Sequence, residues 1–407
     1  SAVGLDVAVG DIVRIESAQK LYTVLGMVTV LKDGLFVIVP FSFIDGFKIN
    51  DKVFLQRDGL TVKCGNGLLG RVVNALGEPI DDLGKIRDLD TNAPINKESM
   101  SPLDRGIIDK KFATGVKAID SMLTCGKGQK VGIFAGSGVG KSTLMGMIVQ
   151  GCEATIKVIA LVGERGREIP EFIHYNLNNN LENTVIVTAT SDESPLMRKY
   201  AAFTAMSIAE YFRDKGHDVL LMMDSVTRFA MAQREIGLST GEPPVSRGYP
   251  PSVFALLPQL MERAGNSKKG SITAFFTVLV DGDDLNDPIA DQSRSILDGH
   301  IVLTRDLTEQ GFYPPINILK SASRVIDKVV TKEHYNDFLK LKRVLSLIKE
   351  NEVLIRVGAY KKGMDLELDS AIAKKEKARE FLTQGTLEKY SFDEIVANLR
   401  KVLIWYH

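Results

Sequence analysis

A glycine-rich segment that ends in Lys141 and Ser142 offers the clearest chemistry in the sequence. Residues 135–142 read Ala-Gly-Ser-Gly-Val-Gly-Lys-Ser, which is the spacing of a phosphate-binding P-loop with alanine in place of the first glycine. Glycines let successive backbone N–H groups curl around a phosphate, and a helix that follows directs its positive N-terminus at the anion. We expect Lys141 to contact the β- and γ-phosphates of a nucleotide and the Ser142 hydroxyl to hold Mg²⁺. The other residues expected to bind the nucleotide are Gly136, Ser137, Gly138, Val139, Gly140 and Thr143.

Acidic residues stand just after two apolar segments, where a nucleotide-hydrolysing site needs carboxylates. Asp224 directly follows an apolar run, and we expect it to orient the magnesium shell. Glu164 comes two residues after another apolar run, and ligands of open α/β sheets bind at the carboxyl ends of strands. We therefore expect Glu164 to orient or deprotonate the attacking water, with Arg165 and Glu168 supporting this base and the metal shell. A helix cap at the first position and a solvated charged turn at the second remain the alternatives.

Three patterns of residues along the chain indicate the elements that position this chemistry. Residues 1–70 contain short β-branched and aromatic runs between turn signals, which favours a small N-terminal β-barrel or sandwich. In residues 71–335 short apolar strands alternate with helical stretches, which predicts an α/β domain with a parallel sheet covered on both faces. Residues 336–407 carry apolar positions at helical spacing, which predicts a helical C-terminal domain whose last helix is anchored by Trp405. The strands expected in the sheet are 130–134, 158–162, 185–189, 219–223 and 271–276.

The composition argues against several classes of protein. The chain has 407 residues with 51 Lys+Arg against 51 Asp+Glu, so its formal net charge is zero, whereas nucleic-acid binders usually carry a basic excess. A hydrophobic content of 44% argues against a disordered chain, and the apolar runs are too short for a membrane-spanning helix. The three cysteines and five histidines form no CxxC, HxxxH or HExxH pattern, which favours reduced thiols in the cytosol and gives a zinc site no support.

Further segments carry a resemblance to a known family. Residues 314–323 read Pro-Pro-Ile-Asn-Ile-Leu-Lys-Ser-Ala-Ser, which fits the α/β signature of ATP synthases, and Arg324 follows them. Together with the P-loop and the two carboxylates, this signature makes the chain similar to the RecA-type hexameric ATPases related to the catalytic subunit of rotary ATP synthases. Within that group it most resembles the flagellar and type III protein-export ATPases. The sequence of residues 248–254 is more similar to the flagellar member than to the type III secretion member. The other segments that carry the resemblance are 70–81, 114–120, 224–228 and 270–275.

The resemblance assigns roles to three more side chains. Arg324 matches the arginine finger that reaches the γ-phosphate bound by the neighbouring subunit, where a cation supplied in trans is worth about 10³–10⁵ in rate. Tyr313 matches the aromatic side chain that stacks on adenine, and Tyr360 is a further candidate for the opposite face of the base. Without the resemblance, Arg324 fits a structural ion pair equally well, and both tyrosines fit a protein core.

The function implied by the resemblance is ATP hydrolysis that energises flagellar or type III protein export. Such a chain is expected to form a homohexameric ring with ATP at the subunit interfaces, in the cytoplasm and peripheral to the inner-membrane export apparatus. Its expected partners are stator or regulator proteins, a central stalk, export substrates or chaperones, and the membrane export gate; no nucleic acid is expected. The alternatives are an RNA-dependent hexameric translocase of the termination-helicase type, a non-catalytic ring subunit, and a subunit of a rotary ATP synthase.

Overall fold

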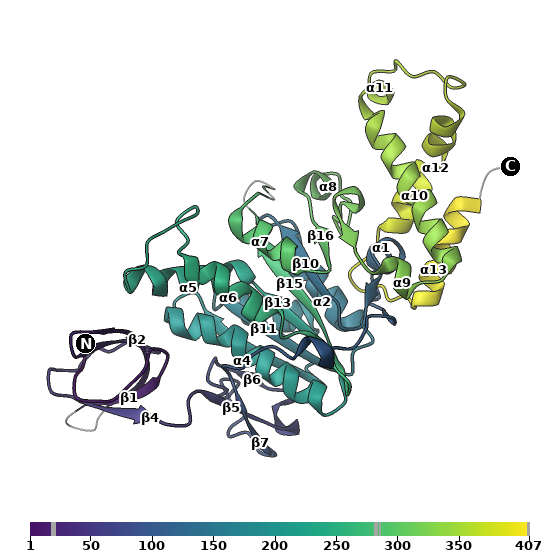
Figure 1. Ribbon diagram of the computed structural model, residues 1–407. Coiled ribbons are helices and arrows are strands. Elements are labelled where there is room, and N and C mark those ends of the chain that lie inside the picture. The colour runs from purple at the N-terminus through teal and green to yellow at the C-terminus, as the bar shows by residue number, and fades with distance from the viewer. Residues whose placement is uncertain (18–21, 281–283, 285, 405–407) are drawn as a thin grey trace.

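The computed structural model describes residues 1–17, 22–280, 284 and 286–404 (Figure 1). A small β-structure holds the N-terminus, a layered α/β body occupies the middle of the molecule, and a group of helices projects at the C-terminal end. This is the order of folds that the sequence predicts. Trp405, which we expected to anchor the last helix, lies outside the described residues. In the described part of the chain, each helix is too short or too polar to cross a membrane.

The N-terminal β-structure is a four-stranded antiparallel sheet with the strand order β3-β2-β1-β4. The turn at Asp33 and Gly34 joins β2 to β3, and both residues have positive φ (51° and 77°), as a tight two-residue hairpin requires. The sheet curls around a core of Val13, Val28 and Phe36, which produces the barrel-like form seen in Figure 1. Its strands are β1 (Ile12–Glu16), β2 (Thr23–Lys32), β3 (Leu35–Pro40) and β4 (Lys52–Gln56).

The centre of the molecule is a mainly parallel sheet, which has nine strands in the described part of the chain. Its order is β17-β16-β10-β15-β13-β11-β12-β6, with β14 paired to β15; β14 and β17 are antiparallel to their neighbours. All five predicted strands are present. The strands are β6 (Val72–Val73), β10 (Lys130–Ala135), β11 (Ile156–Glu164), β12 (Thr184–Thr190), β13 (Asp218–Asp224), β14 (Gly265–Asn266), β15 (Ser271–Leu279), β16 (Gly299–Val302) and β17 (Ala322–Ser323).

Successive residues of the central strands pack on opposite faces of this sheet. In β11, Val158, Ala160 and Val162 belong to the core that includes α4, α5 and α6, whereas Ile159 and Leu161 belong to the core that includes α2. Both faces are therefore buried, which explains why the strands read as continuous apolar runs. The helices of the central body are α1 (Lys117–Met122), α2 (Lys141–Gly151), α3 (Glu168–Glu171), α4 (Pro195–Asp214), α5 (Val226–Ser239), α6 (Pro251–Met261), α7 (Pro288–Ile296) and α8 (Arg305–Glu309).

In residues 336–404 the described part of the C-terminal region consists of helices joined by turns and loops, without a strand. Helices α10 and α12 pack side by side, and α1 of the central body contacts α10, α12 and α13. In Figure 1 the end of this group around α11 projects well away from the central sheet. The helices are α9 (Ile326–Val329), α10 (Lys332–Glu350), α11 (Glu352–Arg356), α12 (Leu366–Leu382) and α13 (Phe392–Ile404).

Two small antiparallel ribbons complete the fold. One joins β5 (Thr61–Cys64) to β7 (Thr91–Pro94) and packs on α4, and the other joins β8 (Lys111–Phe112) to β9 (Cys125–Gly126). The predicted division of the chain at residues 70 and 335 stays a prediction.

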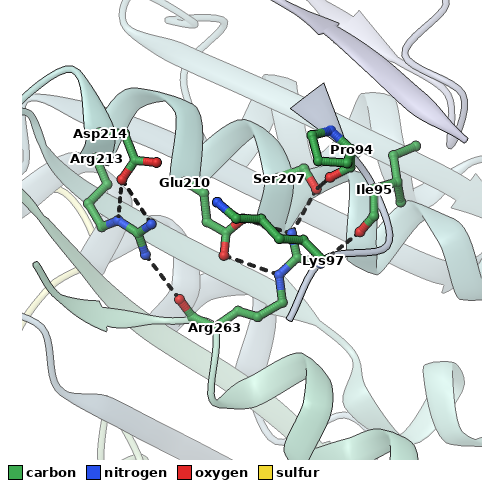
Figure 2. Close-up of polar contacts among 8 residues, drawn as sticks. All are labelled: Pro94, Ile95, Lys97, Ser207, Glu210, Arg213, Asp214 and Arg263. Atoms are coloured by element: carbon green, nitrogen blue, oxygen red, sulfur yellow. Dashed lines mark hydrogen bonds and ion pairs between the residues drawn. The ribbon is translucent and has the colours of Figure 1, made fainter. Parts of the chain in front are cut away.

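A buried ion pair holds the β5–β7 ribbon against the central body. Arg263, between α6 and β14, is fully buried and donates to both carboxylate oxygens of Glu210 on α4, at 3.1 and 2.8 Å. It also donates to the Ile95 carbonyl and the Ser207 hydroxyl, both at 2.8 Å. Figure 2 shows these groups converging on the guanidinium, so Arg263 ties the end of β7 to α4. We call Arg263, Glu210, Ser207 and Ile95 the Arg263 cluster.

Candidate active site

The predicted P-loop joins β10 to α2 at the carboxyl end of the central sheet. Gly138 and Gly140 have positive φ (75° and 88°), a conformation that glycine adopts without strain. Helix α2 begins at Lys141, so the unpaired N–H groups of its first turn face the loop. The loop is exposed at Ser137, Gly138 and Ser142, while Gly136, Gly140 and Thr143 are half-buried. The side chain of Val139 is buried in the core, so any contact that Val139 makes with a nucleotide comes from its backbone.

Lys141 lies between two carboxylates. Its ammonium forms an ion pair with Asp224 and stands 3.8 Å from a carboxylate oxygen of Glu164. The carboxylates come from β13 and β11, and they meet because Leu161 of β11 is paired with Asp224 of β13. The Thr277 hydroxyl on β15 donates to the same Asp224 oxygen at 2.6 Å. We call Lys141, Asp224, Glu164 and Thr277 the Lys141 cluster.

The cluster changes the acidity of Glu164. Burial raises the pKa of Glu164 from its ordinary 4.5 to about 7, and the negative charge of Asp224 and a hydrogen bond with Glu168 act in the same direction. The positive charge of Lys141 opposes them. One ammonium thus faces two carboxylates, and one of these exchanges its proton near neutral pH. Such a carboxyl group is suited to accept a proton from water.

The other two residues predicted around Glu164 lie at the rim of the site. Arg165 is largely exposed (70%), and its guanidinium stands 3.7 Å from the carboxylate of Glu168. Glu168 is the first residue of α3 and reaches back to Glu164. The structure therefore brings Glu168 into the carboxylate group, whereas Arg165 contacts that group only through Glu168.

Arg228 is a candidate that the sequence analysis did not single out. It lies in the first turn of α5 and packs against Gly163, where an added Cβ would lie 2.9 Å from the Arg228 Cβ. The buried Nε of Arg228 has no hydrogen-bond partner within the described residues. A cation whose side chain packs on Gly163, the residue before Glu164, and that has an unused donor suits an anion that approaches the P-loop. The signal in the sequence is its position four residues after Asp224, on the helix that follows the strand.

Tyr313 lies directly against the P-loop. Its hydroxyl donates to the Gly140 carbonyl at 3.4 Å, and an added Cβ on Gly140 would lie 3.0 Å from the Tyr313 ring. The ring is half-buried, so one part of it packs on the protein and another part remains accessible. An aromatic surface beside the start of α2 is what a base next to the phosphates requires.

Tyr360 lies far from Tyr313. Its hydroxyl donates to the Asp365 carbonyl at 2.9 Å and to the Asp369 carboxylate at 2.7 Å, at the start of α12. The Tyr313 carbonyl instead accepts a hydrogen bond at 2.8 Å from the N–H of Gln384, just beyond the other end of α12. Helix α12, which lies between these two points, is about 25 Å long. The structure therefore does not bring the two tyrosines to opposite faces of one base.

Arg324 lies at the end of the sheet opposite the P-loop. Its N–H donates to the Asp298 carbonyl at 3.0 Å, and Asp298 also bonds to Lys130, where β10 begins. The P-loop follows the other end of β10, about 17 Å away for a six-residue strand. The exposed side chain of Arg324 donates to the Arg294 carbonyl at 3.3 Å. Arg324 is therefore too far from the P-loop of its own chain to contact a phosphate bound there.

Comparison with known proteins decides the family. A model of the "ATP synthase alpha/beta family, nucleotide-binding domain" matches residues 115–323, the segment that holds the P-loop, the Lys141 cluster and Tyr313. The chain belongs to the ATP synthase alpha/beta family. A second model, the "T3SS EscN ATPase C-terminal domain", matches residues 330–401. The two matches together confirm the predicted resemblance to the protein-export branch.

Relatives in this family are flagellar and type III secretion ATPases. The flagellum-specific ATP synthase of Helicobacter pylori (strain J99) is 58% identical over 403 residues, which cover 99% of this chain and 92% of the relative. That of Bacillus subtilis is 54% identical over 84% of this chain and 78% of its own length. The type 3 secretion system ATPase of Xanthomonas euvesicatoria is 44% identical over 98% of this chain and 90% of its own length. The chain is thus an ATPase of this group. The prediction that it is most similar to the flagellar members is confirmed.

Solved structures of EscN, an ATPase from the type III secretion system of enteropathogenic E. coli, match the fold. The assembled EscN superposes with a TM-score of 0.93 at 46% identity, over 98% of this chain and 96% of that one. EscN in complex with its central stalk EscO gives a TM-score of 0.91 at 45% identity, with the same coverage. These matches confirm the predicted RecA-like α/β fold with its N-terminal β-structure and helical C-terminal region. They do not favour the RNA translocase or the rotary synthase subunit.

Proposed function

We propose that this chain hydrolyses ATP at the interfaces of a homohexameric ring and that hydrolysis drives flagellar-type protein export. The Lys141 cluster is the observation that supports the catalytic part. It holds an ammonium at the start of α2, a carboxylate at the end of β13, and a second carboxylate of raised pKa at the end of β11. The same cluster argues against a non-catalytic ring subunit, which has no need of a carboxylate that activates water.

Each side chain of the site has one role in this proposal. Glu164 orients a water molecule and accepts its proton while the water oxygen attacks the γ-phosphorus. The bond from the γ-phosphorus to the bridging oxygen breaks, so ADP leaves with that oxygen and phosphate keeps the oxygen of water. Lys141 and Arg228 stabilise the charge on the phosphoryl oxygens, and Arg165 adds a cation at the rim. Arg324 of the neighbouring subunit completes the site in trans.

Mg²⁺ fits the oxygen donors of this site. The Ser142 hydroxyl is exposed in the first turn of α2, and Asp224 and Glu168 offer the hard carboxylate oxygens that Mg²⁺ prefers. No group of three or more His, Cys, Asp or Glu side chains in the described segments is arranged to hold a metal. Water and phosphate oxygens therefore need to supply the remaining ligands, as Mg²⁺ commonly requires. Bound there, Mg²⁺ neutralises charge on the β- and γ-phosphates.

The base of the nucleotide is proposed to stack on Tyr313 alone. The ring lies against Gly140, so a base on its accessible side stands next to the loop that holds the phosphates. Tyr360 has a different role in this proposal, because its hydroxyl joins the loop after α11 to the start of α12.

The tip of the helical region is proposed as the contact for a central stalk. Several apolar side chains are exposed around α11 and the start of α12, and Figure 1 shows this end projecting from the body. EscN has been solved in complex with its central stalk EscO, which supports the same kind of partner here. We also propose stator or regulator proteins, export substrates or chaperones and the membrane export gate as partners, at the cytoplasmic face of the inner membrane. The exposed side chains are Val353, Leu354, Val357, Met364 and Leu366.

Subunit mixing tests whether the sites are shared between neighbours. Glu164→Gln removes the base and Arg324→Ala removes the finger, so each variant alone is expected to lose nearly all hydrolysis. In rings assembled from an equal mixture, about one interface in four pairs an intact Glu164 with an intact Arg324 of the neighbour. We expect the mixture to recover ATPase activity, measured by phosphate release. A mixture no more active than the sum of its components, under conditions where mixed rings form, contradicts the trans site.

A further inference from the structure

Gln384 is a buried side chain that joins the C-terminal helices to the central body. It lies two residues beyond α12 and is only 2% exposed. Its amide oxygen accepts a hydrogen bond from the N–H of Lys117 at 2.7 Å, and its amide nitrogen donates to the carbonyls of Gly115 and Glu388 at 2.9 and 3.0 Å. Its backbone N–H donates to the Tyr313 carbonyl at 2.8 Å. One residue thus contacts three separate segments of the chain.

Two of these segments lead to the two ends of the P-loop helix. Tyr313 packs on Gly140, which directly precedes α2. Gly115 packs on Gly151, the last residue of α2, and an added Cβ on Gly115 would lie 3.0 Å from the Gly151 Cα. Gln384 is therefore connected to the start of α2 through Tyr313 and to the end of α2 through Gly115.

We infer that Gln384 is a positioning residue that sets the place of Tyr313 beside the P-loop and couples it to the C-terminal helices. Helix α12 runs from the exposed apolar tip to Gln384. Near its end, Arg379 donates to the carbonyl of Gln310 at 2.9 Å, so the end of α12 holds the 310–313 segment at two carbonyls. A displacement of α12 along its axis moves this segment and changes the surface offered to adenine. The inference rests on the proposed role of Tyr313 in binding the base.

The chemistry of the position requires glutamine. The side chain satisfies one buried N–H and two carbonyls at once, which takes one acceptor and two donors on a single amide. Glutamate keeps the acceptor but sets a carboxylate against two carbonyl oxygens. Alanine leaves all three groups without this partner, so the turn after α12 loses its attachment to α1 although the backbone bond to Tyr313 remains.

A double-mutant cycle on the full-length chain separates positioning from general stability. It compares kcat and KM for ATP and the Kd for mant-ADP in the wild type, Tyr313→Ala, Gln384→Ala, Gln384→Glu and Tyr313→Ala combined with Gln384→Ala. Loss of a stacking ring is expected to raise KM about tenfold in Tyr313→Ala, with kcat within about twofold. Both Gln384 variants are expected to raise KM about three- to fivefold. In the combined variant KM does not exceed that of Tyr313→Ala, because Gln384 acts through Tyr313.

Other results overturn the inference in recognisable ways. If Gln384→Ala raises KM by the same factor with and without Tyr313, or lowers kcat alone, Gln384 serves only the fold and the inference is wrong. If Tyr313→Ala leaves KM and the mant-ADP affinity unchanged, the proposed base site fails and the inference fails with it. Thr383→Ala is the control, because this neighbouring hydroxyl donates to the Arg379 carbonyl within its own helix, and we expect KM within about twofold. If Gln384→Ala does not fold, Gln384→Glu and its combination with Tyr313→Ala replace it in the cycle.

Discussion

Two buried charge clusters in this molecule differ in how completely their charges are paired. In the Arg263 cluster one guanidinium meets one carboxylate through two hydrogen bonds, and its other bonds go to a hydroxyl and a backbone carbonyl (Figure 2). In the Lys141 cluster one ammonium meets two carboxylates, and the pKa of Glu164 is raised to about 7. The first cluster has little capacity left for a ligand. The second has surplus negative charge and an accessible loop beside it, so it can bind a cation, a phosphate and a proton.

The difference teaches what distinguishes a structural buried charge from a catalytic one. Burial is similar, since the side chains of Arg263 and Glu210 are 0% and 5% exposed and those of Lys141 and Asp224 are 12% and 5% exposed. What differs is the balance of charge inside the cluster. A matched pair contributes to the fold, and breaking it is costly. An unmatched group is itself costly to keep, and such groups gather where chemistry is performed.

The largest effect is expected from removing the surplus carboxylate. Glu164→Gln should lower kcat by about 10²–10⁴-fold, because the carboxylate that we propose as the acceptor of the proton from water is lost. The melting temperature should stay level or rise, because a neutral amide costs less to bury than a second carboxylate. Phosphate release and thermal unfolding measure the two effects, and Glu171→Gln on the neighbouring α3 serves as a control. A variant with wild-type kcat would show that the second carboxylate of the Lys141 cluster is not needed for hydrolysis.

The structural cluster should show the opposite signature. Arg263→Met is expected to lower the free energy of unfolding by about 3–5 kcal/mol, because Glu210 stays buried without its cation. Arg263→Met combined with Glu210→Leu should recover most of that loss, since both charges are then gone. Urea unfolding of the three proteins measures this, with kcat per folded molecule unchanged throughout. A double variant as unstable as the single one would show that shape, and not charge, holds this region together.

The pH dependence of stability should report the second carboxylate of the Lys141 cluster, Glu164. The pKa of Glu164 is raised from 4.5 to about 7, so its contribution to stability is fully present below pH 4.5 and is lost as pH rises to about 7. Relative to Glu164→Gln, the wild type should therefore lose on the order of 3 kcal/mol between these values. Hydrolysis moves in the other direction, because only the ionised carboxylate accepts a proton, so kcat/KM should rise towards pH 7. An equal pH dependence of stability in both proteins would contradict the assignment of this pKa.

The smallest effect is expected at the edge of the Arg263 cluster. Lys97 stands 3.9 Å from Glu210, and its side chain is 44% exposed. Exposed ion pairs contribute little, so Lys97→Ala should change the free energy of unfolding by less than about 0.5 kcal/mol. Urea unfolding of Lys97→Ala and Arg263→Met under the same conditions compares the two losses in the free energy of unfolding directly. A loss above about 1 kcal/mol would show that the cluster needs a second cation and is less completely paired than its geometry indicates.

Much of the fold and part of the site could be read from the sequence. The five predicted strands are present because a strand buried on both faces must be a continuous apolar run. Lys141, Asp224 and Glu164 come together because each lies at or shortly after the carboxyl end of a parallel strand, and parallel strands end at one edge of the sheet. Tyr360 shows the limit of this reasoning. Its place at the far end of α12 depends on how a helix of about 25 Å is oriented, which no local pattern reveals.

What the sequence determined by itself is the local chemistry. A P-loop binds phosphate through the N–H groups of consecutive residues and the start of the next helix, so its spacing alone specifies it. Tertiary structure alone decided how the distant charges are paired. Thr277 meets Asp224 across 53 residues, Arg263 meets Glu210 across 53, and Gln384 meets Gly115 across 269. The pKa of Glu164 depends on which of these charges share its buried surroundings, because burial and Coulomb interactions act through space and not along the chain.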